Sequence, residues 1–127
     1  SMDAAKDDEM PSGYRVYING GRVKTDLDAL AWAKKAVDLG AGEIVLNSMD
    51  ADGTKNGYEI NLTRMIAENV SVPVIASGGG GNPQHLADVL KEGKADAALI
   101  ATMVHSGQYT VNSIKQDLQK QGVPVRL

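Results

Sequence analysis

The fold is decided by the stretch Pro73-Val74-Ile75-Ala76-Ser77-Gly78-Gly79-Gly80-Gly81. Its β-branched apolar residues predict a buried strand, and the glycines after it allow a sharp bend and a close approach to a ligand. Asn82 and Pro83 are residue types preferred at the cap and the first position of a helix. A strand, a glycine loop and a helix N-terminus in that order predict an anion site, so a phosphate-bearing ligand is the first hypothesis. The alternative is that the glycines form only a flexible turn.

Strand and helix patterns alternate along the rest of the chain. Short connections between them predict an α/β fold whose neighbouring strands are parallel. We expect a strand or hairpin arm over Tyr14–Ile18 and then a helix over Thr25–Leu39 with Thr25 and Asp28 at its start. A strand over Glu43–Asn47 should be followed by a helix carrying Leu62, Met65, Ile66 and Val70, and by the strand Val74–Ser77. After the glycines we expect a helix, a strand over Ala95–Ala101, a loop over Met103–Tyr109 and a last helix ending at Gly122.

Length and composition exclude several classes of protein. A chain of 127 residues fits one hydrophobic core, and we expect a single domain over residues 1–127. The net charge of −3 argues against a nucleic-acid partner, which needs clustered Lys and Arg. No apolar run is long enough to span a membrane, and the absence of cysteine permits a cytoplasmic location. His85 and His105 have no metal-ligand spacing, so we expect neither a metal nor a cofactor; His105 remains a weak acid/base candidate.

Three loops are expected to converge at the carboxyl ends of the strands, where parallel α/β folds bind ligands. They are Ser48–Gly57, Ser77–Gly81 and Ala101–Gly107. Glycines offer backbone amides at close range, and the hydroxyls of Ser77 and Thr102 add further donors. Together the three loops favour a phosphate ligand.

Aspartates in two places are candidates for chemistry. The loop that contains Asp50 and Asp52 does not match a calcium loop, because Lys55 and Asn61 occupy the positions of the required glycine and glutamate. One of these aspartates is therefore either a general acid/base or a turn residue. Asp3 is either a terminal aspartate without structure or a residue at the end of a barrel strand, the usual place for a catalytic carboxylate.

Several segments together resemble one known family. They are Trp32 to Gly42, Asn47-Ser48-Met49-Asp50-Ala51-Asp52-Gly53-Thr54-Lys55-Asn56-Gly57-Tyr58, Val74 to Gly81, Ala95-Asp96-Ala97-Ala98-Leu99 and Gly122-Val123-Pro124-Val125-Arg126. The resemblance is to the C-terminal half of the cyclase subunit of imidazole glycerol phosphate synthase, an enzyme of histidine biosynthesis, and covers nearly the whole chain.

The resemblance implies half of a (βα)8 TIM barrel, which is a (βα)4-like parallel sheet with helices on one face. It implies a bis-phosphorylated aminoimidazole carboxamide ribonucleotide as substrate, ammonia supplied by a glutaminase subunit, and imidazole glycerol phosphate as one product. Each half of the family's barrel contributes one phosphate site and one acid/base aspartate. The resemblance carries the catalytic role onto Asp3, phosphate binding onto Asp52, Gly53, Gly78, Gly79, Ala101 and Thr102, and substrate-pocket positions onto Asn47 and Ser77.

The chain also departs from the family. The N-terminal half is absent, and the Thr102-Met103-Val104-His105 segment differs from the commoner Ser-Val-Phe-His version while keeping a hydroxyl. A half-barrel has open sheet edges and an apolar face to cover, so we expect a homodimer or larger assembly, or a fragment of a full-length enzyme. The alternative function is a non-catalytic phosphate-binding half-barrel. For residues 1–12, disorder or an origin in an expression tag is a further alternative.

Overall fold

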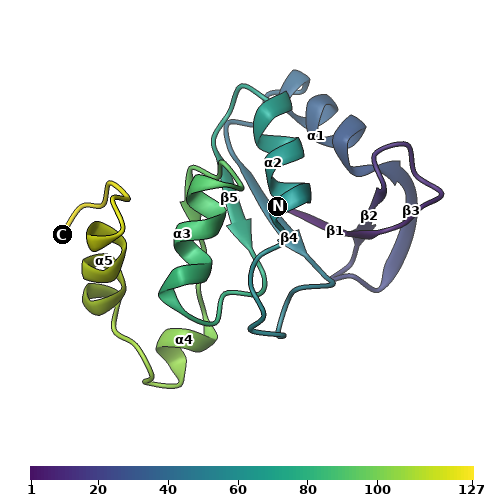
Figure 1. Cartoon of the computed structure of the whole chain (residues 1–127). Coiled ribbons are helices and arrows are strands. Elements are labelled where there is room, and N and C mark those ends of the chain that lie inside the picture. Colours follow the sequence, from purple (N-terminus) through teal and green to yellow (C-terminus); the bar gives the residue numbers. More distant parts are fainter.

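One sheet of six strands forms the framework of this computed structural model, which describes residues 1–127 (Figure 1). The strands lie in the order β3-β2-β1-β4-β5-β6. Their bounds are β1 (Met2–Lys6), β2 (Tyr14–Ile18), β3 (Val23–Asp28), β4 (Ile44–Ser48), β5 (Val74–Ser77) and β6 (Ala97–Ala98). β1, β4, β5 and β6 run parallel, whereas β1 to β2 and β2 to β3 are antiparallel pairings. The α/β prediction is confirmed, and the β2–β3 hairpin extends the parallel sheet at one side.

The helices connect the parallel strands and pack on one face of the sheet. Their bounds are α1 (Ala29–Asp38), α2 (Ile60–Asn69), α3 (Pro83–Lys91), α4 (Thr102–His105) and α5 (Val111–Lys120). Figure 1 shows α1, α2 and α3 side by side, with α5 next to the C-terminus. This arrangement is consistent with half of a TIM barrel. No helix has the length and apolar character that crossing a membrane requires.

The strand sequences alternate between the helix-covered face and the opposite face. On β4, Ile44 and Leu46 are buried in the hydrophobic core, and on β5 Val74 and Ala76 are buried in the same way. Side chains at the intervening positions point to the other face, since successive residues of a strand alternate. The face opposite the helices therefore carries Asp3, Val45, Asn47, Ile75 and Ser77.

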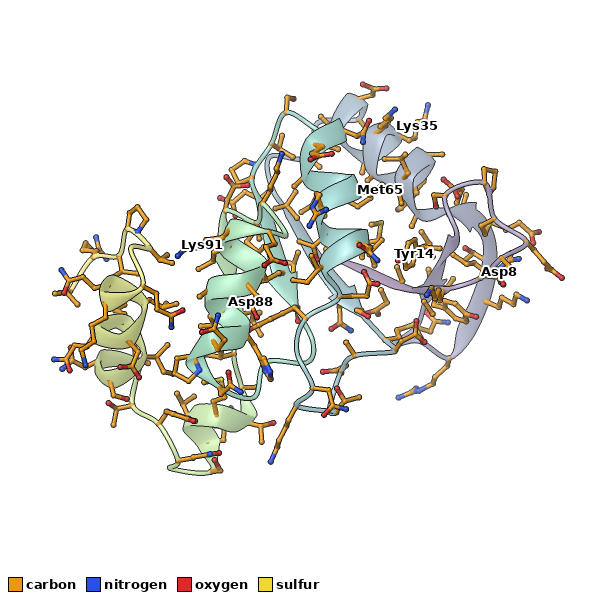
Figure 2. All side chains as sticks on the ribbon, in the orientation of Figure 1. Asp8, Tyr14, Lys35, Met65, Asp88 and Lys91 are labelled. Carbon is orange, nitrogen blue, oxygen red and sulfur yellow. The ribbon has the colours of Figure 1, made fainter.

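Two clusters of buried side chains make up the core. The first lies among β1, β2, β4, α1 and α2, and the second lies around α3, α4 and α5. Tyr14 belongs to the first cluster, and its hydroxyl donates a hydrogen bond to Glu59 Oε1 over 3.0 Å at the start of α2 (Figure 2). β5 contributes to both clusters, with Val74 in the first and Ala76 in the second.

The predicted helix over Thr25–Leu39 begins later than expected. Val23–Asp28 form β3, and the helix begins at Ala29 with Asp28 as its cap, accepting a hydrogen bond from the Ala31 N–H over 3.0 Å. The Thr25 hydroxyl instead donates to the Val16 carbonyl on β2 over 2.6 Å. The Thr25 start was wrong because cross-strand pairing with β2 outweighs the local capping pattern.

Three further segments differ from the expectation. The strand expected over Ala95–Ala101 is limited to Ala97–Ala98, and the loop expected over Met103–Tyr109 contains most of α4. Within residues 1–12, Met2–Lys6 are not disordered but form β1, which lies between β2 and β4 in the sheet.

A buried arginine fastens the hairpin to the turn after β1. Arg15 is only 3% exposed, and its Nε donates to Asp7 Oδ2 over 2.6 Å, while one terminal nitrogen reaches Glu9 over 3.3 Å. The other terminal nitrogen donates to the Thr25 carbonyl on β3 over 2.7 Å. A buried charge needs such partners, and here they come from both sides of β2.

Acid is expected to destabilise the fold through two carboxylates near this hairpin. The Arg15 guanidinium holds the pKa of Asp7 below its ordinary value. Burial alone would raise the pKa of Asp28, but hydrogen bonds led by the one from Ser12 outweigh it and lower the pKa. Lowered carboxylate pKa values contribute stability above the unfolded-state pKa that is lost as the pH falls through the folded-state pKa. The urea midpoint should therefore fall between about pH 5 and about pH 3.

Two variants check the origin of this acid sensitivity. Asp7→Asn should flatten the dependence of the urea midpoint on pH, whereas Asp8→Asn, which removes an exposed carboxylate on the same turn, should keep the wild-type dependence. A wild-type midpoint that does not change over this range would contradict the assignment.

Candidate functional site

A row of polar side chains crosses the sheet on the face without helices. In the strand register Asp3 on β1 lies opposite Asn47 on β4, and Asn47 lies opposite Ser77 on β5. Neighbouring strands are about 4.8 Å apart, so these side chains lie next to one another. The Asn47 amide Nδ2 donates a hydrogen bond to Asp3 Oδ1 over 2.9 Å. The structure thus brings together Asp3, Asn47 and Ser77.

Asp3 is half-buried and keeps one carboxylate oxygen free. Oδ1 accepts from Asn47, and Oδ2 accepts no hydrogen bond from the chain. A carboxylate held at one oxygen and open at the other can exchange a proton with a ligand above the sheet. No group of three or more His, Cys, Asp or Glu side chains is arranged to hold a metal ion.

A small hollow lies at the end of this row, where the three predicted loops meet. Its volume is about 50 Å³, far smaller than the roughly 300–1,000 Å³ of a pocket that encloses a whole ligand. The hollow therefore suits one small group rather than an entire nucleotide. The lining residues are Asp52, Gly53, Lys55, Ser77, Gly78, Gly79, Gly80, Leu99, Ile100, Ala101 and Thr102.

The hollow is lined by hydrogen-bond donors that have no partner in the chain. The N–H groups of Gly53, Gly78, Gly79 and Ala101 donate no hydrogen bond within the protein, and neither do the hydroxyls of Ser77 and Thr102. Backbone N–H groups in such a concavity bind anions. All of the substrate-binding residues expected from the sequence except Asn47 line this hollow, and Asn47 lies in the polar row beside it.

The glycines leave no room for side chains because the loop after β4 packs on them. A Cβ on Gly78 would lie 2.8 Å from the Ser48 carbonyl oxygen. On Gly79, whose φ is +104°, it would collide with the Gly57 carbonyl. The Gly57 N–H in turn donates to the Gly79 carbonyl over 2.8 Å. The glycine loop is therefore a packed contact between two loops rather than only a flexible turn.

The N-terminus of α3 takes no part in lining the hollow. The Gly81 N–H donates to His85 Nδ1 over 3.1 Å, and the Asn82 side chain accepts from the His85 N–H over 3.1 Å. His85 therefore holds the end of the glycine loop instead of lying free on the helix surface. Of the sequence-based anion site, the glycine loop lines the hollow and no residue of α3 does. His105, at the end of α4, does not line it either.

The two loop aspartates have different surroundings. Asp50 Oδ2 accepts the Lys6 N–H over 2.7 Å, so it joins the loop to the end of β1 rather than making a local turn hydrogen bond. Asp52 lines the hollow, but its own N–H donates to the Ser48 carbonyl over 2.9 Å. Its contribution to a phosphate site would therefore be to shape the loop, since an exposed carboxylate repels an anion.

The charged lining residue Lys55 was missed from the sequence. Lys55 is exposed, forms no salt bridge and is the only cationic side chain among the lining residues. Its position between Gly53 and Gly57 was the available signal, because a lysine in a glycine-rich loop is a common partner for phosphate.

Comparison with known proteins assigns the chain to a family. Residues 1–110 match the protein family described as "Histidine biosynthesis protein". The chain belongs to this family. Within the family it is a homologue of HisF, the cyclase subunit of imidazole glycerol phosphate synthase, as the resemblance predicted.

Individual HisF relatives match almost all of this family member. It is 65% identical over 121 residues to "Imidazole glycerol phosphate synthase subunit HisF" of Desulfatibacillum aliphaticivorans. The aligned region covers 95% of this chain and 46% of the relative. It is 52% identical over 126 residues to the subunit of the same name from Prochlorococcus marinus, and this alignment covers 99% of this chain and 49% of the relative. The chain spans about half the length of the curated relatives it matches.

Proposed function

We propose that the chain acts as the C-terminal half of a HisF-type cyclase and binds one phosphate of a bis-phosphorylated aminoimidazole carboxamide ribonucleotide. The observation that carries the proposal is the polar row Asp3, Asn47 and Ser77, which runs directly into the donor-lined hollow. A substrate phosphate in the hollow would place the adjoining part of the substrate over the row. Family membership over residues 1–110 supports the same conclusion.

In this proposal the residues divide the work between binding and proton transfer. Gly53, Gly78, Gly79, Ala101 and Thr102 bind the phosphate, and Asp52 shapes the loop beside them. Asn47 and Ser77 orient the substrate over the sheet. Asp3 acts as the acid/base, because Oδ1 is held by Asn47 and Oδ2 accepts no hydrogen bond within the chain. Ammonia is supplied by a glutaminase subunit, no cofactor is required, and a cytoplasmic location remains a prediction.

Removing the cation of the hollow should weaken phosphate binding. We expect Lys55→Gln to raise the dissociation constant for inorganic phosphate by roughly two- to fivefold, since Lys55 is an exposed charge whose attraction water and salt screen. Amide chemical-shift titration of the isotope-labelled chain measures both the affinity and the responding residues. The responding amides should include those of Gly78, Gly79 and Thr102.

Lys35→Gln is the matched control for this measurement. Lys35 is an exposed lysine in the last turn of α1 and does not line the hollow (Figure 2). The control should keep the wild-type affinity. A wild-type chain whose loop amides do not respond to phosphate, or a Lys35→Gln variant that loses as much affinity as Lys55→Gln, would contradict the phosphate assignment.

A second candidate is a phosphate-binding half-barrel that self-associates without catalysing the reaction. The feature that favours self-association is an apolar groove of about 640 Å³ between α3, α5, β6 and the C-terminal residues. It runs beside β6, which ends the sheet and has an unpaired edge. Lys91, labelled in Figure 2, lines the groove from α3 and donates a hydrogen bond to the Gln121 carbonyl.

We propose that a second copy of the chain covers this groove when the chain is alone. Sedimentation velocity at micromolar concentration should then show a dimer or a larger assembly. A stable monomer would contradict self-association. Catalysis is tested separately, by adding the N-terminal half of a HisF relative to the chain: phosphate binding without turnover in that mixture would favour the non-catalytic candidate.

A further inference from the structure

Tyr58 lies where the three loops of the hollow meet, although it does not line the hollow itself. The residue is only 6% exposed and belongs to the core cluster around α3 and α5. Its hydroxyl donates a hydrogen bond to the Leu99 carbonyl over 2.7 Å, a contact between positions 41 residues apart in the sequence. Burial raises the pKa of the Tyr58 hydroxyl to about 12, so the group remains a donor near neutral pH.

The ring of Tyr58 also supports the glycine loop. A Cβ on Gly80 would lie 2.6 Å from the Tyr58 hydroxyl oxygen, so this glycine allows the loop to rest against the phenol. The preceding residue, Gly57, donates its N–H to the Gly79 carbonyl over 2.8 Å. The pair Gly57-Tyr58 thus contacts the glycine loop through the Gly57 backbone and the Tyr58 ring, and reaches Leu99, just before the third loop, through the Tyr58 hydroxyl.

The bond from Tyr58 leaves both backbone groups of Leu99 hydrogen-bonded, two residues before the third loop begins at Ala101. The Leu99 N–H donates to the Ala76 carbonyl over 2.8 Å, and the Leu99 carbonyl accepts from Tyr58. Ala101 and Thr102, which line the hollow, follow within three residues. Neither is tied to the other two loops by a hydrogen bond of its own. The position of Ala101 and Thr102 relative to the glycine loop therefore depends on the two hydrogen bonds of Leu99.

We propose that Tyr58 is a positioning residue of the phosphate site, and that its hydroxyl sets the spacing between the third loop and the glycine loop. The proposal rests on the proposed phosphate site. It assigns to Tyr58 no contact with the ligand. Without the hydroxyl the Leu99–Thr102 segment is held on one side only, and the donors of Ala101 and Thr102 no longer face those of Gly78 and Gly79.

Tyr58→Phe tests the proposal, because it removes the hydroxyl and keeps the ring that supports Gly80. One hydrogen bond is worth about 0.5–1.5 kcal/mol, so the dissociation constant for inorganic phosphate should rise roughly two- to twelvefold. Amide hydrogen exchange should become faster at Leu99, whose N–H donates to the Ala76 carbonyl, while the amides of β1 and β4 keep their wild-type rates. Both are measured by nuclear magnetic resonance on the full chain.

Tyr14→Phe is the matched control. Tyr14 is also buried and its hydroxyl also makes one hydrogen bond, to Glu59, but it belongs to the other core cluster. It should keep wild-type phosphate affinity even if it loses stability. Unchanged affinity in Tyr58→Phe, or an equal loss in Tyr14→Phe, would overturn the proposal. If the wild type itself does not respond to phosphate, the proposed function fails, and exchange alone decides: an unchanged rate at Leu99 in Tyr58→Phe would overturn the positioning role.

Discussion

Asp3→Asn is expected to lower ammonia-dependent turnover by about 10²- to 10⁴-fold, the usual contribution of a general acid or base. Asparagine has the same shape and still offers an oxygen to the Asn47 amide, which in the wild type donates to Asp3 Oδ1 over 2.9 Å. It cannot exchange a proton at the other position. The assay uses the chain mixed with the N-terminal half of the Desulfatibacillum aliphaticivorans relative, ammonium salts and the bis-phosphorylated substrate.

Asp8→Asn is the control for this loss. Asp8 is an exposed aspartate on the turn after β1 and is labelled in Figure 2. Asp8→Asn removes one negative charge, as Asp3→Asn does, but Asp8 is not part of the polar row. Turnover should therefore remain at the wild-type level. The assignment of Asp3 would be refuted by an Asp3→Asn variant with wild-type turnover, or by an equal loss in Asp8→Asn. Inorganic phosphate should bind equally well to all three proteins, because neither residue lines the hollow.

Gly79→Ala should destabilise the fold by about 2–6 kcal/mol, through backbone strain and overpacking together. The φ of Gly79 is +104°, a conformation that residues with a Cβ rarely adopt. The added methyl would also collide with the Gly57 carbonyl, which is backbone and has no rotamer through which to move away. Urea denaturation followed by circular dichroism measures the loss.

Two other glycines separate strain from collision. Gly53→Ala introduces strain alone, since the φ of Gly53 is +77° and the added methyl would have no neighbour within 4 Å. Gly42→Ala introduces neither, because Gly42 has open space and no positive φ. The free energy of unfolding should therefore fall least for Gly42→Ala and most for Gly79→Ala. A Gly79→Ala variant as stable as Gly53→Ala would show that the loop after β4 does not pack on the glycines. Because the change affects folding, Gly79 is a poor position for testing phosphate contact.

The two parallel strands β4 and β5 could be predicted because their local and global preferences agree. Glu43–Asn47 and Val74–Ser77 are short apolar runs bounded by turn residues, and the structure has strands at Ile44–Ser48 and Val74–Ser77. The meeting of three loops followed from the general rule for parallel sheets. The hollow, lined by Gly53, Gly78 and Thr102, lies where the loops were expected to converge.

The remaining features depend on contacts between distant parts of the chain. The second strand of the hairpin, β3 (Val23–Asp28), contains a helix-like capping pattern. Only its pairing with β2 makes it a strand. The hydrogen bond from Asn47 to Asp3 depends on the register of two strands that lie 44 residues apart. The bond from the Gly81 N–H to His85 Nδ1 spans only four residues, but Gly81 also packs against the Lys55 carbonyl, a contact with a distant loop that the local sequence does not reveal.

The shared strand β5 has a consequence for how the chain folds. Val74 and Ala76 lie on the same face two residues apart, yet they belong to different core clusters. Cooperative folding units often coincide with such clusters and differ in stability. We expect the unit around α3 and α5, whose groove is open, to unfold at lower denaturant than the unit around α1 and α2. The four residues of β5 would then be the boundary at which a partly folded intermediate ends.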